Sequence, residues 1–333
     1  CRGEIVNSAD IFLRISDLTK TYKLEAGLFA SASRWVWALN GVSFDIHRGE
    51  TYGLVGESGS GKTTLARTLV QLFPHTSGKI EYFSGQDRWE VTRSDRRLLR
   101  RFRSDLKYVF QDPSSALDPR MNVLRILTTG SRYAEARERM DRLAARAREI
   151  MEAVGMSARD LGRRPSEFSG GQRQRISLAR ALFSQPQGLI CDEVVSALDV
   201  SIQSQILNLL IDLKKQFRLT ILFIAHDLTV VSYMADRIGV LYGGSLMEEA
   251  PAAELTTDPR HPYSQLLYRA VPRLGAKAPD RGTTAGTPFN ATRMPVGCPF
   301  TGRCPLEQEV CRREKPPLRM VSPGHRVACH FVS

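Results

Sequence analysis

The sequence predicts an α/β fold in which helices cover both faces of a mainly parallel sheet. Strand-length apolar runs alternate with amphipathic helical segments along most of the chain, and this alternation is typical of parallel sheets with helical crossovers. One apolar strand also runs directly into a glycine-rich turn and a helix. With 333 residues, 42% of them hydrophobic and 25% charged, the chain has room for one large domain with an appendage or for two modest domains.

The first expected elements are strands. Residues 11–22 and 36–46 are rich in β-branched and aromatic residues, which favours strands, and the segment 23–34 between them is expected to be a loop. A short apolar strand at 51–55 enters the glycine-rich turn, and a helix is expected over 65–72. Strand, turn and helix together form the setting that a phosphate-binding loop requires.

The middle of the chain has the sequence pattern of helices and not of strands. Residues from about 114 to 166 predict a helical insertion, because the segment 134–154 has apolar residues at helical spacing with Arg and Glu on the other face. Beyond it, 188–191 and 219–225 predict buried strands, and 200–217 predicts an amphipathic helix between them. The sequence contains no internal repeat.

The end of the chain predicts an irregular linker and then a compact module. After Ala250 the regular periodicities stop and turn-forming residues become frequent, namely Pro259, Pro262, Pro272, Gly275, Pro279, Gly282, Gly286, Pro288 and Pro295. Four of the six cysteines fall in the last 36 residues, and they are Cys298, Cys304, Cys311 and Cys329. In a cytosolic protein such a cluster binds metal more often than it forms disulfides. Cys191 lies in an apolar run and is expected to be a buried thiol.

Charge and hydropathy constrain the partners and the location. The net charge of +12 and the pI near 9.7 favour an anionic partner such as a nucleotide, a nucleic acid or an anionic membrane face, with a solvated basic surface as an equally good alternative. No apolar run approaches the roughly 20 residues that span a bilayer, and residues 1–10 lack an apolar signal-peptide core. We therefore expect a cytosolic chain, whose start without Met is consistent with trimming or truncation.

Residues 56–63 fit the phosphate-loop pattern at every required position. The backbone N–H groups of such a loop, together with the positive end of the following helix, form an anion-binding nest. Lys62 is expected to reach the β- and γ-phosphates of a nucleotide, and the Thr63 hydroxyl is expected to ligate Mg²⁺. The predicted nucleotide-binding residues of this segment are Gly56, Glu57, Ser58, Gly59, Ser60, Gly61, Lys62, Thr63 and Thr64.

Asp192 and Glu193 end the apolar strand that begins at Gly188. An Asp at the carboxyl end of such a strand can hold Mg²⁺ near the phosphates, and the adjacent Glu can polarise the attacking water as a general base. Taken without the phosphate loop, the pair would be an ordinary charged strand end.

A second anion site is predicted at a helix start formed by Ser169, Gly170, Gly171 and Gln172. Helix N-termini expose unpaired N–H groups that bind anions. A simple N-cap is the alternative, but two consecutive glycines are not needed for a cap, so the pattern favours phosphate contact.

These three segments, in this order and spacing, resemble the ATP-binding cassette (ABC) family over about residues 11–250. The resemblance implies ATP as the nucleotide and a domain with a mainly parallel core sheet, an N-terminal antiparallel β part and an inserted helical subdomain. It also implies four site residues: Gln111 as the Q-loop glutamine that touches Mg²⁺, Asp199 of the D-loop 196–199, His226 as the switch histidine at the γ-phosphate, and Tyr22 as the aromatic side chain stacked on adenine.

Two positions depart from the family pattern, and one match has a plainer alternative. Val194 stands where the family usually has Pro, and Phe168 replaces the commoner Leu. Neither change removes a catalytic group. His226 alone would be better explained as a core histidine, but its place after a strand in this family pattern favours the catalytic role.

The segments 110–119 and 261–267, with the cysteine module, resemble the ATPases of oligopeptide/dipeptide importers, whose C-terminal extension would cover residues 251–333. The resemblance implies ATP hydrolysis that powers peptide import at the cytoplasmic face of the membrane. The implied partners are a second ABC ATPase subunit (a sister chain or a second copy), two transmembrane permease subunits and an extracytoplasmic solute-binding protein. Two ATPase subunits would pack head to tail, so that Lys62 of one and Ser169 of the other hold the same ATP. Nickel or another small solute is the alternative cargo.

The cysteine spacings are C-x5-C, C-x6-C and C-x17-C, which are wider than those of zinc knuckles. Four thiolates on a looped segment suit a cubane cluster at least as well, and the resemblance to the importer ATPases favours [4Fe–4S] over zinc. The expected role is to fasten the tail. His325 and His330 flank Cys329 and are expected to lie at the surface or to bond to backbone.

Six arginines between Arg93 and Arg103 alternate with apolar residues. A solvated amphipathic helix is the plainer interpretation, and attraction to anionic lipid is the sharper one. No aromatic platform accompanies the charge, so nucleic-acid binding is not expected. A soluble ABC ATPase acting on ribosomes or DNA would usually carry two cassettes or a long coiled-coil insertion, and this chain has neither. A redox sensor built on the cysteines would need an output domain that the sequence does not contain.

Overall fold

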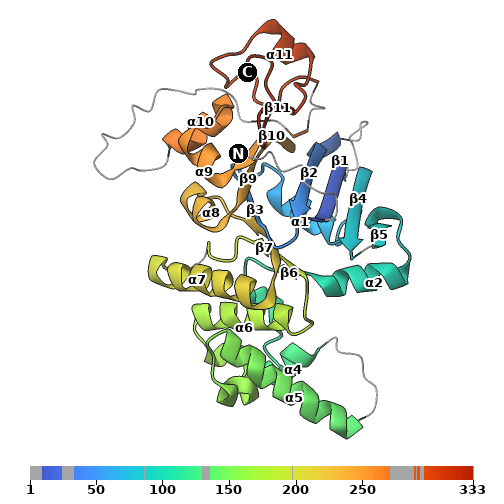
Figure 1. Cartoon of the computed structure of the whole chain (residues 1–333), viewed down its shortest axis with the longest axis vertical. Helices are drawn as coiled ribbons and strands as arrows, with labels where there is room; N and C mark the ends of the chain where they lie inside the picture. The colour runs from blue at the N-terminus through green and yellow to red at the C-terminus, as the bar shows by residue number, and fades with distance from the viewer. Residues whose placement is uncertain are drawn as a thin grey trace, which may run out of the picture. The chain divides into compact units, whose positions relative to one another are not determined.

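The computed structural model describes residues 10–24, 34–85, 87–129, 136–196, 198–270, 289, 291–292 and 296–332 (Figure 1). The side chains of Ser114 and of residues 136–140 are outside this description. The chain divides into two compact units, residues 1–95 with 223–333 and residues 96–222, called here the first and the second unit. Most of the expected loop 23–34 lies outside the described residues. The irregular linker expected after Ala250 is wrong for residues 252–269, which form the helices α9 (Ala252–Thr257) and α10 (Pro262–Arg269), because Pro262 lies in the first turn of α10, where proline is compatible with a helix. Most of residues 271–295 lies outside the described residues.

The first unit contains the predicted antiparallel β part. Its strand order is β2-β1-β4-β5, with β1 at Ile11–Leu24, β2 at Arg34–His47, β4 at Ser77–Ser84 and β5 at Asp87–Glu90. Alternating apolar side chains are buried, including Leu13 and Ile15 in β1 and Val42, Phe44 and Ile46 in β2, as the period of two along a strand requires. Arg14 and Asp45 face each other across the two strands as an ion pair at 3.0 Å.

A second sheet of the first unit carries the predicted central strand. The strands of this sheet that lie wholly in the first unit have the order β11-β12-β10-β9-β3, with β3 at Thr51–Val55, β9 at Arg237–Tyr242, β10 at Ser245–Pro251, β11 at Arg319–Ser322 and β12 at His325–Val327. β3 pairs with β9 in parallel, and the other neighbours are antiparallel. Every residue of β3 is buried, which is typical of a strand covered on both faces. The helices of this unit are α1 (Lys62–Leu69), α8 (Leu228–Met234), α9 (Ala252–Thr257), α10 (Pro262–Arg269) and α11 (Glu309–Arg313).

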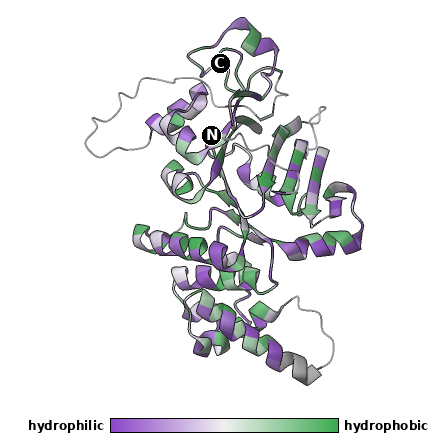
Figure 2. Cartoon of the chain, viewed as in Figure 1, coloured by the Kyte–Doolittle hydropathy of each residue, from purple (hydrophilic) through white to green (hydrophobic). Residues whose placement is uncertain are grey.

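The second unit joins a parallel strand pair to the predicted helical part. β6 (Leu106–Val109) pairs in parallel with β7 (Gly188–Asp192), and Cys191 of β7 is fully buried as expected. The helices are α2 (Arg96–Asp105), α3 (Pro113–Ala116), α4 (Val123–Thr128), α5 (Ala136–Ala153), α6 (Gly170–Leu182) and α7 (Val200–Phe217). Hydrophobic and hydrophilic residues alternate across α7 (Figure 2), and its buried residues fall at the helical spacing that the sequence predicts. β8 (Thr220–Ile224) crosses the boundary between the two units in sequence.

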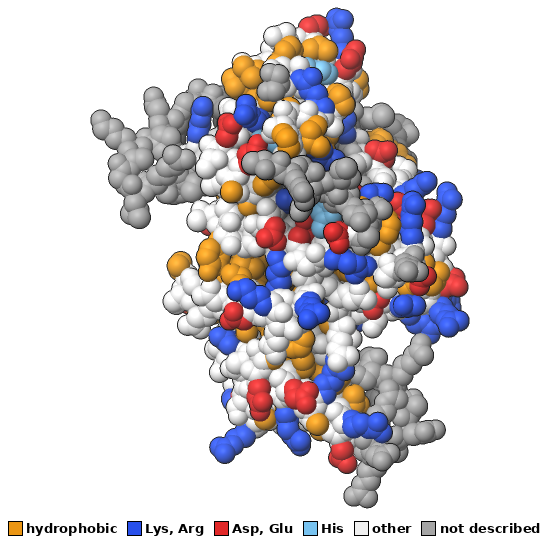
Figure 3. All heavy atoms as spheres, in the orientation of Figure 1, with side chains coloured by type: hydrophobic (Ala, Val, Ile, Leu, Met, Phe, Trp, Pro, Cys, Tyr) orange, Lys and Arg blue, Asp and Glu red, His pale blue; other side chains and the backbone are white. Residues whose placement is uncertain are grey.

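The α/β fold class is confirmed, while two helix boundaries differ from the prediction. The helix expected over 65–72 begins at Lys62, because Gly61 takes a left-handed conformation and serves as its N-cap, and it ends at Leu69. The arginine-rich helix begins at Arg96 and buries Phe102, and Figure 3 shows Lys and Arg side chains gathered over it. Within the described part of the chain, no helix is both long and apolar enough to cross a membrane.

Candidate nucleotide-binding site

The glycine-rich loop between β3 and α1 leaves no room for side chains at its two ends. Gly56 has a φ of 155°, and a Cβ there would lie 2.1 Å from the carbonyl oxygen of Leu241. Gly61 has a φ of 106°, and its Cβ would lie 2.4 Å from the carbonyl oxygen of Ala38. Both positions therefore require glycine, since a side chain would force backbone atoms apart. The result is a tight turn that leads directly into the N-terminus of α1, as a phosphate-binding loop needs.

Lys62 folds back over this loop. Its side chain is buried, and its Nζ donates to the carbonyl oxygens of Gly56 at 2.6 Å and Glu57 at 3.0 Å, with the Oγ of Ser60 at 3.5 Å. The ammonium group thus lies against the loop, held by two of the loop's own carbonyl oxygens. Thr63 and Thr64 follow in the first turn of α1, while Ser58 and Gly59 are exposed at the tip of the loop.

Tyr22 lies on β1, half-buried, and meets the ring of Phe73 edge-on at a centroid distance of 6.1 Å. The Nζ of Lys20 stands 4.6 Å from the centroid of the Tyr22 ring. His226 follows β8 and is exposed. The preceding residue donates its N–H to the carbonyl oxygen of Leu54 in β3 at 3.4 Å, so His226 and the loop follow adjacent strand ends in the first unit.

In the second unit, three residues of the segments predicted to form the site lie close together, namely Gln111, Glu193 and Ser196. Glu193 accepts a hydrogen bond at Oε2 from the Nε2 of Gln111 at 2.8 Å, and the same Nε2 lies 3.4 Å from the Oγ of Ser196. Glu193 has a φ of 50°, a left-handed conformation that is costly for a residue with a side chain and is concentrated at functional sites. The buried carboxylate of Asp192, at the end of β7, accepts a hydrogen bond from the Tyr108 hydroxyl, a partner that the sequence analysis missed.

Ser169 is the N-cap of α6. Its hydroxyl accepts from the N–H of Gln172, and the Gln172 side chain accepts from the N–H of Ser169, which completes a capping box. A Cβ on Gly171 would lie 2.7 Å from the Cγ2 of Ile202 in α7, so helix packing explains this glycine. The sequence argument that two consecutive glycines favour phosphate contact is therefore weakened. Asp199 caps α7 without a side-chain hydrogen bond and is exposed.

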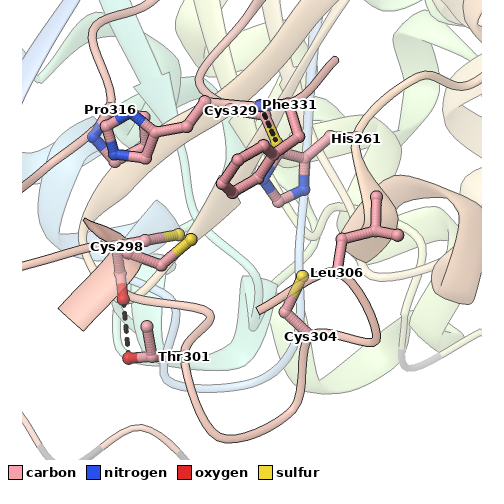
Figure 4. Close-up of a pocket in the computed structure, with 10 residues that line it drawn as sticks. His261, Cys298, Thr301, Cys304, Leu306, Pro316, Cys329 and Phe331 are labelled. Atoms are coloured by element: carbon pink, nitrogen blue, oxygen red, sulfur yellow. Dashed lines mark hydrogen bonds between the residues drawn. The ribbon is translucent and has the colours of Figure 1, made fainter. Parts of the chain in front are cut away.

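The four clustered cysteines line one small cavity at the end of the chain. The thiols of Cys298, Cys304, Cys311 and Cys329 share it with His261 and His330 among other residues, and Figure 4 shows the side chains of Cys298, Cys304 and Cys329 around the cavity. Burial raises the pKa of Cys298 to about 12, and the other three cysteines add to this effect. The thiols thus lie close enough to influence each other. Among the described residues, however, no group of three or more His, Cys, Asp or Glu side chains is arranged to hold a metal ion.

His325 does not lie at the surface, contrary to the sequence prediction. It is fully buried, with Nε2 2.7 Å from Glu248 and Nδ1 2.8 Å from Glu254. The expectation failed because both carboxylates lie more than 70 residues earlier in the chain, beyond any local pattern. His330 bonds to the backbone carbonyl of Glu314 at 3.1 Å, as expected.

Two residues far from the loop in sequence also contact it. The hydroxyl of Tyr263 accepts a hydrogen bond from the N–H of Glu57, and Arg303 forms an ion pair with the Glu57 carboxylate. The sequence analysis missed both contacts. Arg303 stands between two of the clustered cysteines, and this is the one local signal that could have drawn attention to it.

Comparison with known proteins agrees with this geometry. The ABC transporter family model matches residues 39–196, and the model of the oligopeptide/dipeptide transporter C-terminal region matches residues 247–311. The oligopeptide transport ATP-binding protein AppF of Bacillus subtilis is 41% identical over 331 residues, covering 97% of this chain and 98% of that protein. A putative peptide import ATP-binding protein of Brucella abortus is 45% identical over 323 residues, covering 97% of this chain and 94% of that protein.

The fold of the chain is similar to that of solved ATP-binding cassettes. The dimeric ATP-binding cassette MJ0796, in a post-hydrolysis state with ADP and Pi, is 27% identical with a TM-score of 0.59, covering 72% of this chain and 98% of that one. CbiO1 from Clostridium perfringens is 24% identical with a TM-score of 0.61, covering 75% and 92% respectively, and supports the fold alone. On its loop geometry, its two matching family models and its near full-length relatives, the chain belongs to the ATP-binding subunits of oligopeptide/dipeptide-type ABC transporters.

Proposed function

We propose that the chain binds and hydrolyses ATP to power the import of peptides across the cytoplasmic membrane, as one subunit of a multisubunit ABC transporter. The closed glycine loop with Lys62 folded over it carries the ATP-binding part of the proposal. The similarity to an oligopeptide transport ATP-binding protein and to a putative peptide import ATP-binding protein supports peptides as the cargo. Nickel or another small solute is the alternative cargo. A cassette of residues 11–250, with a helical subdomain at about 114–166, and an extension of residues 251–333 belong to the same proposal.

In the proposed ATP site, the loop supplies binding and charge. The N–H groups of the Gly56–Thr64 segment would surround the phosphates, since a turn that enters a helix N-terminus directs its N–H groups at an anion. The buried ammonium of Lys62 would exchange carbonyl partners for phosphate oxygens, and Tyr22 would stack on the adenine ring. Thr63, Gln111 and Asp192 would ligate Mg²⁺, which neutralises phosphate charge when bound.

For hydrolysis we propose Glu193 as the general base. Its carboxylate already accepts a hydrogen bond from Gln111, and its backbone has the left-handed conformation that is concentrated at functional sites. The carboxylate would accept a proton from the attacking water, while Gln111 keeps it oriented. His226 would contact the γ-phosphate from the end of β8.

A second ATPase subunit, either a sister chain or a second copy, would complete the site. Ser169, Gly170, Gly171, Gln172 and Asp199 lie at the starts of α6 and α7, where Ser169, Gln172 and Asp199 are exposed, and these helix starts would approach the ATP bound to the other subunit. The dimeric structure of the MJ0796 cassette supports such pairing. Two permeases and an extracytoplasmic solute-binding protein would complete the importer and hold this chain at the inner membrane face as a peripheral subunit.

For the cysteine cavity we propose a [4Fe–4S] cluster, with zinc as the alternative. Four thiols line one small cavity, and their spacings in the sequence are wider than those of zinc knuckles. Cys298, Cys304, Cys311 and Cys329 would hold the cluster through their thiolates. Protein purified without oxygen should be brown and contain iron and labile sulfide. Colourless protein without iron would overturn the assignment.

The ATPase proposal is tested by Glu193→Gln in the purified chain. The variant should bind ATP and turn it over at least about 100-fold more slowly, since general-base catalysis contributes roughly that much. Near-normal turnover would refute the role of Glu193.

The transport proposal is tested separately by affinity purification of the chain from detergent-solubilised membranes. Two multi-span permeases in the purified complex would support it, and ribosomal proteins or no partner would count against it.

A further inference from the structure

Glu57, the second residue of the phosphate loop, is held by an arginine from the C-terminal extension. The guanidinium of Arg303 forms two parallel hydrogen bonds to the Glu57 carboxylate, from Nη1 to Oε2 and from Nη2 to Oε1, both at 2.9 Å. Paired charge-assisted bonds of this kind fix both distance and orientation. The Arg303 side chain is only 13% exposed, so water competes weakly for it.

The backbone of Glu57 is held as well. Its N–H donates to the hydroxyl of Tyr263 at 2.9 Å, and its carbonyl oxygen accepts from the Nζ of Lys62 at 3.0 Å. Glu57, whose carbonyl oxygen binds the ammonium of Lys62, is therefore held through its side chain and through its N–H by residues of the C-terminal extension.

An aromatic cluster keeps these two contacts in place. The ring of Tyr263 lies 4.6 Å from that of Tyr242 and 5.3 Å from that of Phe300. The guanidinium carbon of Arg303 stands 5.5 Å from the Tyr242 centroid and 5.6 Å from the Phe300 centroid, within the range of cation–π attraction. The three rings are buried, so neither the hydroxyl nor the guanidinium can turn away without disrupting packing.

We propose that Arg303 and Tyr263 are positioning residues of the nucleotide site: the C-terminal extension holds Glu57, and with it the turn of the phosphate loop that leads to Lys62, in the ATP-binding geometry. The inference rests on the proposed role of Lys62. Arg303 and Phe300 are also neighbours in sequence of Cys298 and Cys304, which line the cysteine cavity. The ring of His261, which lines the cavity, lies 6.0 Å from that of Phe300, so a change in the cavity would reach Glu57 through Phe300 and Arg303.

The test measures ATP affinity of the full chain with a fluorescent ATP analogue and Mg²⁺. Releasing the loop lowers the fraction of molecules in the binding geometry, and the apparent Kd rises in proportion. We expect Arg303→Ala to raise Kd about tenfold and Tyr263→Phe, which keeps the ring, to raise it about threefold. At saturating ATP, kcat should change much less than KM, because neither residue touches the reacting atoms.

Arg312→Ala is the matched control. Arg312 lies in the same module and is paired with Glu307 at 2.7 Å, but its side chain is 69% exposed, and its loss should leave Kd unchanged. The exchanged pair Glu57→Arg with Arg303→Glu should recover part of the affinity that either single change removes. By the reciprocity of coupled sites, ATP should also slow hydrogen exchange in residues 298–304 of the wild-type chain.

Lys62→Ala separates the two proposals. If Lys62→Ala binds ATP normally, the phosphate-loop assignment is wrong. If Lys62→Ala loses binding while Arg303→Ala and Tyr263→Phe match the wild type and Arg312→Ala, the positioning role alone is overturned. A folded Arg303→Ala chain that loses kcat with unchanged KM would also overturn it.

Discussion

Replacing His325 with alanine should release the β11–β12 hairpin from the rest of the first unit. The imidazole bridges Glu248 on β10 and Glu254 on α9, with contacts of 2.7 and 2.8 Å. Both the imidazole and the Glu248 side chain are fully buried. The substitution leaves Glu248 buried without its charged partner.

The magnitude follows from what remains around Glu248. Removing one member of a buried ion pair costs about 3–5 kcal/mol. Glu248 keeps two backbone hydrogen bonds, from the N–H of Arg260 at 2.6 Å and of His261 at 3.0 Å, so the lower end applies. A loss of about 3 kcal/mol corresponds to roughly a 100-fold increase in the population of the opened hairpin.

The contribution of His325 depends on pH in a defined direction. Burial disfavours the imidazolium, but the hydrogen bonds to Glu248 and Glu254 outweigh it and raise the pKa of His325 above its ordinary 6.5. The stabilisation is therefore complete below pH 6.5 and is lost as the pH rises through the folded-state pKa. The hydrogen bond from His325 lowers the pKa of Glu254 below its ordinary 4.5, so that contribution is present above pH 4.5 and is lost as the pH falls through the folded-state pKa. The hairpin should be held most firmly between pH 4.5 and 6.5.

The assay is hydrogen exchange at the β12 amides of the full chain, read between pH 5 and 9. His325→Ala should raise the opening population most at low pH, and the difference from the wild type should shrink as the pH rises. His325→Gln, which has no proton to lose, should open to an extent that does not change with pH, so its difference from the wild type should shrink in the same way. Met320→Ala serves as the control, because Met320 lies on the same hairpin and is 61% exposed. Wild-type exchange in His325→Ala, or an equal difference at every pH, would refute the reasoning.

Three further substitutions test the loop, the helix packing and the tail. Gly56→Ala should destabilise the chain by about 2–3 kcal/mol in urea unfolding and weaken ATP binding, because its Cβ would lie 2.1 Å from a backbone oxygen; an unchanged unfolding midpoint would contradict this. Gly171→Ala should lower the free energy of unfolding by about 1–3 kcal/mol. Gly170→Ala, whose Cβ would meet nothing closer than 3.8 Å, should leave the free energy of unfolding unchanged or raise it slightly. Equal effects of the two substitutions would refute the packing argument. Cys298→Ser should increase proteolysis within residues 296–332 while far-UV circular dichroism shows a folded cassette, and complete unfolding would contradict the proposed domain boundary.

Local patterns in the sequence were sufficient for the loop and for the elements beside it. Buried apolar residues in β3 and the fixed glycine spacing predict a strand and a phosphate turn, because both depend on neighbours within a few residues. The amphipathic helix α7 was predicted with its correct bounds for the same reason. The start of α1 was predicted three residues late, because the left-handed Gly61 cap lets the helix begin inside the motif itself.

Contacts between distant segments were beyond the sequence patterns. The burial of His325 depends on two carboxylates from β10 and α9, and no periodicity in residues 319–330 reveals them. The role of Gly171 depends on Ile202 in another helix. In each case the residue type was visible in the sequence, but the partner that gives it a role was supplied by tertiary packing.

The contacts of Glu57 also bear on the order of events during protein synthesis. Glu57 is made 206 residues before Tyr263 and 246 residues before Arg303. At about 5–20 residues per second, translation separates Glu57 from Arg303 by on the order of 10 to 50 seconds. During that interval the strand and helix around the loop can form, but the loop lacks two of its supports. A nascent or prematurely terminated chain would therefore carry a complete phosphate-loop sequence without a fully positioned phosphate loop.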